Sequence, residues 1–224
     1  MNKFLSTTFV LAVASGGMIA SSVVQAEDKI RYYDVTITNV TREQSFTPVL
    51  AATHGDGVRL FRLGDPASPE LATLAEGGAT QPLADLLATN PQVSNITTTA
   101  GLLDAGKSVT LRIAAGEGAK KLSMAAMLVP TNDAFFALNG VELPRGNEPS
   151  VYFSPIFDAG SEPNDELCAN MPGPVCGGVG NSPGAGGEGY VFVHAGIHGI
   201  GDLEAAKYDW RNPGAMIVVR RVKE

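Results

Sequence analysis

Residues 33–40 read YDVTITNV, and apolar and polar side chains alternate in them from Tyr33 to Thr38. Such alternation is typical of a β-strand with one buried face, and the β-branched residues favour a strand further. Similar short apolar segments lie at residues 47–52, 108–114, 121–129, 133–138, 151–157, 190–194 and 215–222, and 58–63 fits a strand or an irregular edge. Because loops rich in glycine and proline separate them, the sequence predicts an all-β chain, an antiparallel sandwich of about eight strands.

One region departs from this pattern. From residue 68 to residue 90, apolar residues recur at helical rather than alternating spacing. A first short helix is predicted with Ser68 as its cap and Pro69 at its first position. A second is predicted over residues 81–89, where the following Asn-Pro pair would end it. We expect both helices to lie in the connections and to cover one end of the sandwich.

The first 26 residues have the features of a secretory signal peptide. Lys3 supplies the positive charge, residues 4–13 are mostly apolar, and Val24-Gln25-Ala26 fits a cleavage site for small residues. The alternative, an uncleaved anchor helix, is disfavoured because the apolar run is too short to span a bilayer comfortably. We therefore expect residues 27–224 to form one exported domain, secreted or periplasmic, with no transmembrane segment after cleavage.

The chain is acidic. It carries 16 Lys and Arg against 23 Asp and Glu, a formal net charge of −7, and loss of Lys3 would make the charge one unit more negative. A protein of this charge has no electrostatic footprint for nucleic acid or for an anionic membrane, so neither is expected as a partner. The same charge suits the binding of a cation.

The two cysteines, Cys168 and Cys176, lie in one loop rich in proline and glycine. In an exported protein, such a pair indicates a local disulfide. Free thiols are the alternative. A zinc pair is disfavoured because the spacing is too wide for a zinc ribbon and no second pair exists.

Two acidic segments, PTND at residues 130–133 and DAGSE at residues 158–162, each follow an apolar run. Carboxylates are thus placed where a strand gives way to a loop, and hard oxygen ligands gathered there are what a calcium ion needs. Asp165 and Glu166 follow closely and could contribute. The alternative is that these are ordinary loop carboxylates in contact with solvent, a common place for Asp.

A histidine segment offers a competing metal site. His194, His198 and Asp202 recur every four residues and would share one face of a helix, as zinc ligands do. However, glycines at positions 196, 199 and 201 interrupt the stretch, and each costs a helix about 1 kcal/mol relative to alanine. The glutamate that serves as general base in such hydrolases is also absent. A metal-dependent hydrolase using these three residues is therefore kept as the alternative function.

Four segments in this order resemble the spondin domain, the N-terminal module of F-spondin and mindin, in its stand-alone exported bacterial form. They are MLVPTNDAFF at 127–136, DAGSE at 158–162, HAGIHGIGDL at 194–203 and YDWRNP at 208–213. The resemblance covers essentially all of residues 27–224. It implies an antiparallel β-sandwich similar to C2 domains, with a calcium ion held by loops at one end.

The resemblance also implies the ligands. The aspartate of the family's S-P-D-W segment falls on Asp133, and the acidic ends of its D-A-G-T-D segment fall on Asp158 and Glu162. The tryptophan after the first aspartate is replaced by Ala134, and the last acid is Glu rather than Asp. The animal members are matrix adhesion proteins, but their partners do not carry over to a chain of bacterial type.

The sequence therefore leads to one favoured function. We expect an exported calcium-binding domain without enzymatic activity, used in adhesion to or recognition of a protein or glycan ligand outside the cytoplasm. A third possibility is a purely structural envelope protein whose acidic loops hold no ion.

Overall fold

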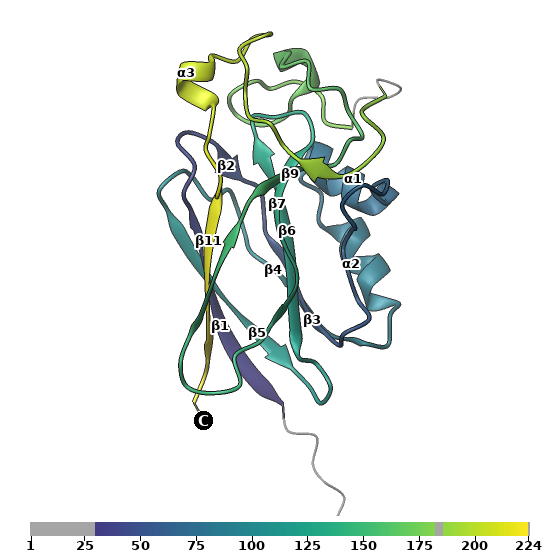
Figure 1. Cartoon of the computed structure of the whole chain (residues 1–224), viewed down its shortest axis with the longest axis vertical. Coiled ribbons are helices and arrows are strands. Elements are labelled where there is room, and N and C mark those ends of the chain that lie inside the picture. Colours follow the sequence, from purple (N-terminus) through teal and green to yellow (C-terminus); the bar gives the residue numbers. More distant parts are fainter. Residues whose placement is uncertain (1–29, 182–185, 224) are drawn as a thin grey trace, which may run out of the picture.

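The computed structural model describes residues 30–181 and 186–223, and within them the chain forms a β-sandwich with helices packed on one side (Figure 1). The signal peptide predicted at residues 1–26 lies outside the described residues. The strands are β1 (Arg31–Asn39), β2 (Ser45–Phe46), β3 (Leu50–His54), β4 (Val93–Thr98), β5 (Ser108–Ala115), β6 (Lys121–Val129), β7 (Ala134–Glu142), β8 (Ser150–Ser154), β9 (Ile156–Asp158), β10 (Phe192–Val193) and β11 (Ala215–Arg221). The helices are α1 (Pro69–Gly77), α2 (Gln81–Ala88), α3 (Ala205–Tyr208) and a 3₁₀ turn, η1 (Cys168–Asn170).

The strands form two sheets. The first has four strands in the order β5-β1-β11-β8, and the second has seven, in the order β10-β9-β7-β6-β3-β4 with β2 also paired to β6. The pairings within both sheets are antiparallel. The predicted all-β antiparallel sandwich is therefore confirmed. The described residues contain more strands than the roughly eight expected, because β2 and β4 were not predicted and one predicted strand divides into β8 and β9.

The alternation in β1 reflects one buried face, as predicted. Tyr33, Val35 and Ile37 are fully buried and contribute to a core between the two sheets. The intervening residues of the strand lie on the outer face, where Thr36 and Thr38 bond to side chains of β5. The face of β1 that packs between the sheets is therefore apolar, and the outer face is polar.

The second sheet is covered on both faces. Its far face packs against α1 and α2, where Leu71, Leu74 and Leu83 form a second core with Phe135. This double burial explains why β6 is almost continuously apolar. The expectation that the helices cover an end of the sandwich was wrong: they cover a face. The start of α1 is as predicted, because the Ser68 hydroxyl accepts a hydrogen bond from the Leu71 amide at 3.2 Å.

Some predicted strand limits change. The apolar run 151–157 is two strands rather than one, since Pro155 separates β8 in the first sheet from β9 in the second. Residues 58–63 contain no strand and run as an irregular segment. The disulfide Cys168–Cys176 is confirmed. Among the described residues, no helix is long and apolar enough to cross a membrane.

Candidate metal centre

The two acidic segments meet at one end of the second sheet. Asp133 is the residue before β7, and Asp158 is the last residue of β9. These strands are neighbours, with Ala134 directly opposite Asp158, so the register places the two aspartates side by side. The loop before β7 and the loop after β9 therefore lie at the same end of the molecule, at the top in Figure 1.

Asp133 is fully buried and is held mainly by one of its two oxygens. Its Oδ2 accepts hydrogen bonds from the Ser161 amide at 2.8 Å, the Ser161 hydroxyl at 3.2 Å and the Glu162 amide at 3.1 Å. Its Oδ1 is also buried but has no hydrogen-bond partner in the described part of the chain. A buried carboxylate oxygen without a donor is costly, so this atom marks a place for a proton or a cation.

Asp158 is also fully buried, but both its oxygens have donors. Oδ1 accepts a hydrogen bond from the Gly160 amide at 2.7 Å, and Oδ2 accepts one from the Asn164 side chain at 2.6 Å. The first bond closes a tight turn by the aspartate's own side chain. The second fixes the direction in which the carboxylate faces.

Asn164 is fixed in turn by His194. The Gly196 amide donates to His194 Nδ1 at 2.9 Å, so the imidazole proton lies on Nε2, which bonds Asn164 Oδ1 at 2.9 Å. Burial, with a smaller effect of nearby His198, lowers the pKa of His194 to about 4. The ring is therefore neutral near pH 7. Its Nε2 lies 3.6 Å from Asp158 Oδ2 but does not neutralise that carboxylate.

No nearby cationic side chain in the described part of the chain compensates the negative charge of the two aspartates when they are ionised. Burial raises the pKa of Asp133 to about 6, even though three hydrogen bonds favour its ionised form. Burial, and then the charge of Asp133, raise the pKa of Asp158 to about 8. Two carboxylates that share a dry site resist joint ionisation, and a bound cation removes that penalty.

The turn between Asp158 and Glu162 requires a glycine. Gly160 has φ +66°, and a Cβ built on it would overlap the carbonyl oxygen and the amide nitrogen of Tyr190. Only glycine meets both conditions without strain. The turn then aims the Ser161 and Glu162 amides at Asp133, which ties the two acidic segments together.

Glu162, the third predicted ligand, is less clearly placed for a metal ion than the two aspartates. Its side chain is buried, with 1% exposed, and its backbone bonds Asp133. Within residues 30–181 and 186–223, however, no three His, Cys, Asp or Glu side chains are arranged to hold a metal ion. The structure thus brings Asp133 and Asp158 together and leaves Glu162 as a prediction. A hard cation fits the paired oxygens, but the rest of its shell must come from carbonyls, hydroxyls or water.

Three neighbours of the pair were not found from sequence. They are Asn164, Glu188 and His194, of which only His194 had been considered, and in another role. The Asn164 amide also donates to Glu188 at 3.2 Å, and the charge of Glu188 raises the pKa of both aspartates. The loop that carries Glu188 reaches the pair because β10 joins β9. Nothing local in the sequence signals that approach.

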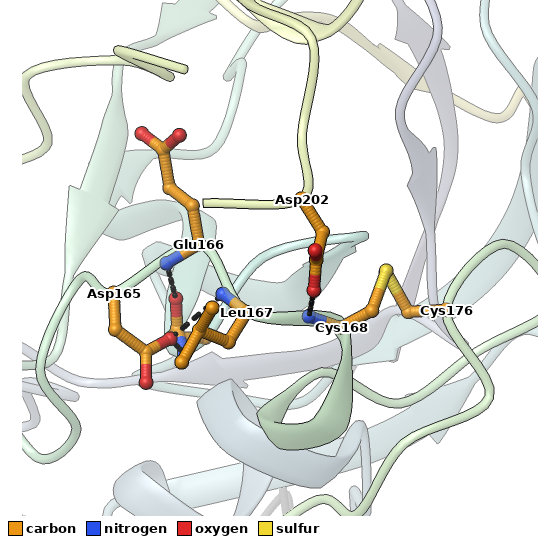
Figure 2. The surroundings of a disulfide bond; sticks show 7 residues. Asp165, Glu166, Leu167, Cys168, Cys176 and Asp202 are labelled. Atoms are coloured by element: carbon orange, nitrogen blue, oxygen red, sulfur yellow. Dashed lines mark hydrogen bonds between the residues drawn. A yellow bond between two sulfur atoms is a disulfide. The ribbon is translucent and has the colours of Figure 1, made fainter. Parts of the chain in front are cut away.

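The histidine segment does not form the alternative zinc site. Residues 194–203 are loop, as the glycines indicated, and both ring nitrogens of His194 are engaged. Asp202 accepts a hydrogen bond from the Cys168 amide at 2.8 Å, next to the disulfide (Figure 2). His198 is exposed. The described residues therefore do not gather these three side chains as ligands.

Asp165 and Glu166, considered as additional ligands, hold loops instead. Glu166 accepts hydrogen bonds from the His198 amide at 2.6 Å and the Ile200 amide at 2.9 Å. Asp165 accepts a hydrogen bond from the Leu167 amide at 2.9 Å (Figure 2). It accepts another from the Asn132 side chain at 3.0 Å. Their oxygens are occupied by backbone and amide donors, which ties the histidine segment to the first acidic segment.

The fold and the site together define an antiparallel β-sandwich with a pair of buried carboxylates in its end loops. A family model, Spondin_N, matches residues 37–160. The match spans more than half of the 224 residues, and the chain belongs to the Spondin_N family. The matched range contains Asp133 and Asp158 and ends before Glu162 and His194. No curated protein matches the chain.

Proposed function

We propose that this protein is an exported spondin-like domain that binds one calcium ion between Asp133 and Asp158. Bound calcium would supply the positive charge that the two buried carboxylates need. The observation that carries the proposal is Asp133 Oδ1, an oxygen that is buried, has no donor among the described residues and lies in the pair's common site. Glu162 is proposed as a third ligand.

The ligand atoms available to an ion near the pair favour calcium over other metals. They are carboxylates and a serine hydroxyl, both hard oxygen ligands. The one imidazole close by, His194, has both nitrogens engaged in hydrogen bonds, so a zinc-type nitrogen ligand is not available. Calcium accepts irregular shells of six to eight oxygens, whereas magnesium demands a near-octahedral one.

The proposed role of the ion is to order a recognition surface rather than to catalyse a reaction. The hydrogen bonds of the centre run to loop backbone at Gly160, Ser161 and Glu162. Loops placed by a rigid sheet commonly carry binding function. We propose adhesion to, or recognition of, a protein or glycan outside the cytoplasm. Export is supported by the signal-like residues 1–26 and by the Cys168–Cys176 disulfide, which suits an oxidising compartment.

Thermal melting of chelator-stripped protein tests the proposal. Calcium at about 100 times its Kd should stabilise the fold by about 2.7 kcal/mol, and equal magnesium should do much less. Asp133→Asn and Asp158→Asn should each abolish the calcium effect. Asp65→Asn, an exposed aspartate, is the matched control and should keep it. If calcium does not raise the melting temperature of the unaltered protein, the proposal is wrong and the acidic loops hold no ion.

A further inference from the structure

A hollow lies on the helix-bearing side of the second sheet, away from the carboxylate pair. Its volume is about 510 Å³, and it is lined by Arg59, Phe61, Arg62, Leu63, Asn139 and Phe157. That volume falls in the range of pockets that take small organic molecules. Five of the six lining residues are arginine or apolar, a combination that the calcium centre does not use.

The two arginines of this hollow are uncommitted. Arg59 and Arg62 are both exposed and have no side-chain hydrogen bond or ion pair with any residue the structure describes. Glu142 at the end of β7 and Asp56 in the turn after β3 are already engaged, since Lys121 pairs with them at 2.5 Å and 3.8 Å. Two free guanidinium groups at the mouth of one hollow are notable in a chain of net charge −7. Guanidinium forks bind carboxylates with two parallel hydrogen bonds.

The segment that carries the arginines is irregular but fixed in place. Asn139 on β7 accepts a hydrogen bond from the Leu60 amide and donates one to the Phe61 carbonyl, each at 2.8 Å. Further along, the segment exchanges two hydrogen bonds of 2.9 Å with Val191: one from the Gly64 amide and one to the Asp65 carbonyl. These four bonds hold the segment on both sides of Arg62 and directly after Arg59. The hollow is therefore preformed, which lowers the entropic cost of binding.

The floor of the hollow is aromatic. The rings of Phe61 and Phe157 meet edge to face with centroids 4.9 Å apart, and each side chain is 9% exposed. Leu63 stands at the rim with 58% of its surface exposed. A ligand that covered Leu63 and the ring edges would remove apolar surface from water while its charge stayed at the mouth.

We propose that this hollow binds a small organic anion that carries a carboxylate on an apolar body. The carboxylate pairs with Arg59 and Arg62, and the apolar body rests on Phe61, Phe157 and Leu63. The site is separate from the proposed calcium centre. Phe157 packs into the core under the helices, whereas Asp158, the next residue of β9, faces the other side of the sheet, so the two sites can succeed or fail independently.

Calorimetric titration with phenylacetate and with its neutral amide, phenylacetamide, tests this proposal on the mature protein. Phenylacetate should bind at least about tenfold more tightly than the amide, because a charge-assisted bidentate pair is lost in the amide. The double variant Arg59→Gln/Arg62→Gln should weaken phenylacetate binding by a similar factor. A second double variant, Arg145→Gln/Arg220→Gln, removes two exposed arginines elsewhere and should bind as the unaltered protein does.

The outcomes separate clearly. The four substituted arginines are exposed, so melting temperatures should stay close to that of the unaltered protein and confirm folding. Equal affinity for the acid and the amide, equal weakening by both double variants, or no binding of phenylacetate at millimolar concentration would each overturn the proposal. Titration in chelator and in calcium should give the same Kd, which keeps this test distinct from that of the calcium centre.

Discussion

At the scale of residues, Asp133 and Asp158 are held in a state that favours neutralisation. Both are fully buried, yet neither has a cationic side chain as partner in the described chain. The donors they have are amides, a hydroxyl and an asparagine side chain, which stabilise a charge without cancelling it. The free energy of folding must therefore depend on what neutralises the pair.

The first prediction concerns pH. The folded pKa values of Asp133 (about 6) and Asp158 (about 8) lie above the ordinary value of 3.8. Their contribution to stability is therefore complete below pH 3.8 and is lost as pH rises through 6 to 8. Chelator-treated protein should melt at a lower temperature at about pH 8.5 than at about pH 6.5. His194 does not interfere, because its lowered pKa costs stability only at more acidic pH.

Calcium should remove or reverse that slope, since binding requires the ionised carboxylates. The control is the double variant Asp133→Asn/Asp158→Asn, which has no proton to lose in this range and should melt independently of pH above 6.5. A slope that persists in the double variant would assign the effect to other groups.

The second prediction concerns the third carboxylate. Glu162 is buried beside Asp133, whereas Glu188 is exposed and acts on the pair through its charge. If Glu162 is a ligand, Glu162→Gln should weaken calcium binding by about tenfold or more, and Glu188→Gln by a few-fold at most because solvent screens its charge. Calcium titration of both variants by calorimetry measures this. The opposite order would replace Glu162 by Glu188 in the ligand set.

The two aspartates could be predicted from sequence because each stands where an apolar run ends, and adjacent strands bring such positions together. Asn164 and Glu188 could not be predicted, since their approach depends on the pairing of β10 with β9. The role of Glu166 could not be decided from sequence for a related reason. A carboxylate near an acidic cluster can bind an ion or hold a loop by hydrogen bonds. For Glu166, the structure shows hydrogen bonds from the His198 and Ile200 amides, which the sequence does not reveal.

At the scale of elements, the turn that joins Asp158 to Glu162 is the most constrained piece of the site. The third prediction is that Gly160→Ala destabilises the protein by about 2 kcal/mol or more, because the new Cβ meets the Tyr190 backbone. Gly101→Ala is the matched control: its φ of +68° is close to the +66° of Gly160, but nothing lies within 4 Å of its Cβ. It should cost only the backbone strain of about 1 kcal/mol.

The difference in the free energy of unfolding between these two variants, measured in urea, separates the clash with the Tyr190 backbone from the strain of the positive φ. Gly160→Ala should also weaken calcium binding, because the Ser161 and Glu162 amides would no longer hold Asp133. Equal stability of the two alanine variants would mean that the Tyr190 backbone yields freely.

Long apolar or alternating elements were predictable, and short or polar ones were not. The limits of β6 match residues 121–129, and β1 and β5 differ from their predicted ranges by one or two residues. Pro155 was underestimated: it has no amide to continue a ladder, so the chain changes sheet there. The strand β4 was missed because its sequence, VSNITT, is mostly polar and only half-buried.

At the scale of the whole molecule, the second sheet belongs to two cores at once. On β6 and β7, Leu128 and Phe136 face the core between the sheets, while Ala125 and Phe135 face the core under the helices. Neighbouring residues of the same strands thus serve opposite layers. This sharing could not be predicted from the sequence, where the helices were expected at an end of the sandwich. It implies that neither layer keeps its packing once the other is lost.

The last prediction follows from that sharing. Leu74 on α1 is fully buried under the helices, and Leu74→Ala should cost about 2–5 kcal/mol. Because the sheet links the layers, the loss should appear equally in helical circular dichroism and in the fluorescence of Trp210, the single tryptophan, which lies in the core between the sheets. Leu86→Ala on α2, at 43% exposed, should cost under about 1 kcal/mol. Helices that melt before the Trp210 signal changes would show instead that the sandwich folds without them.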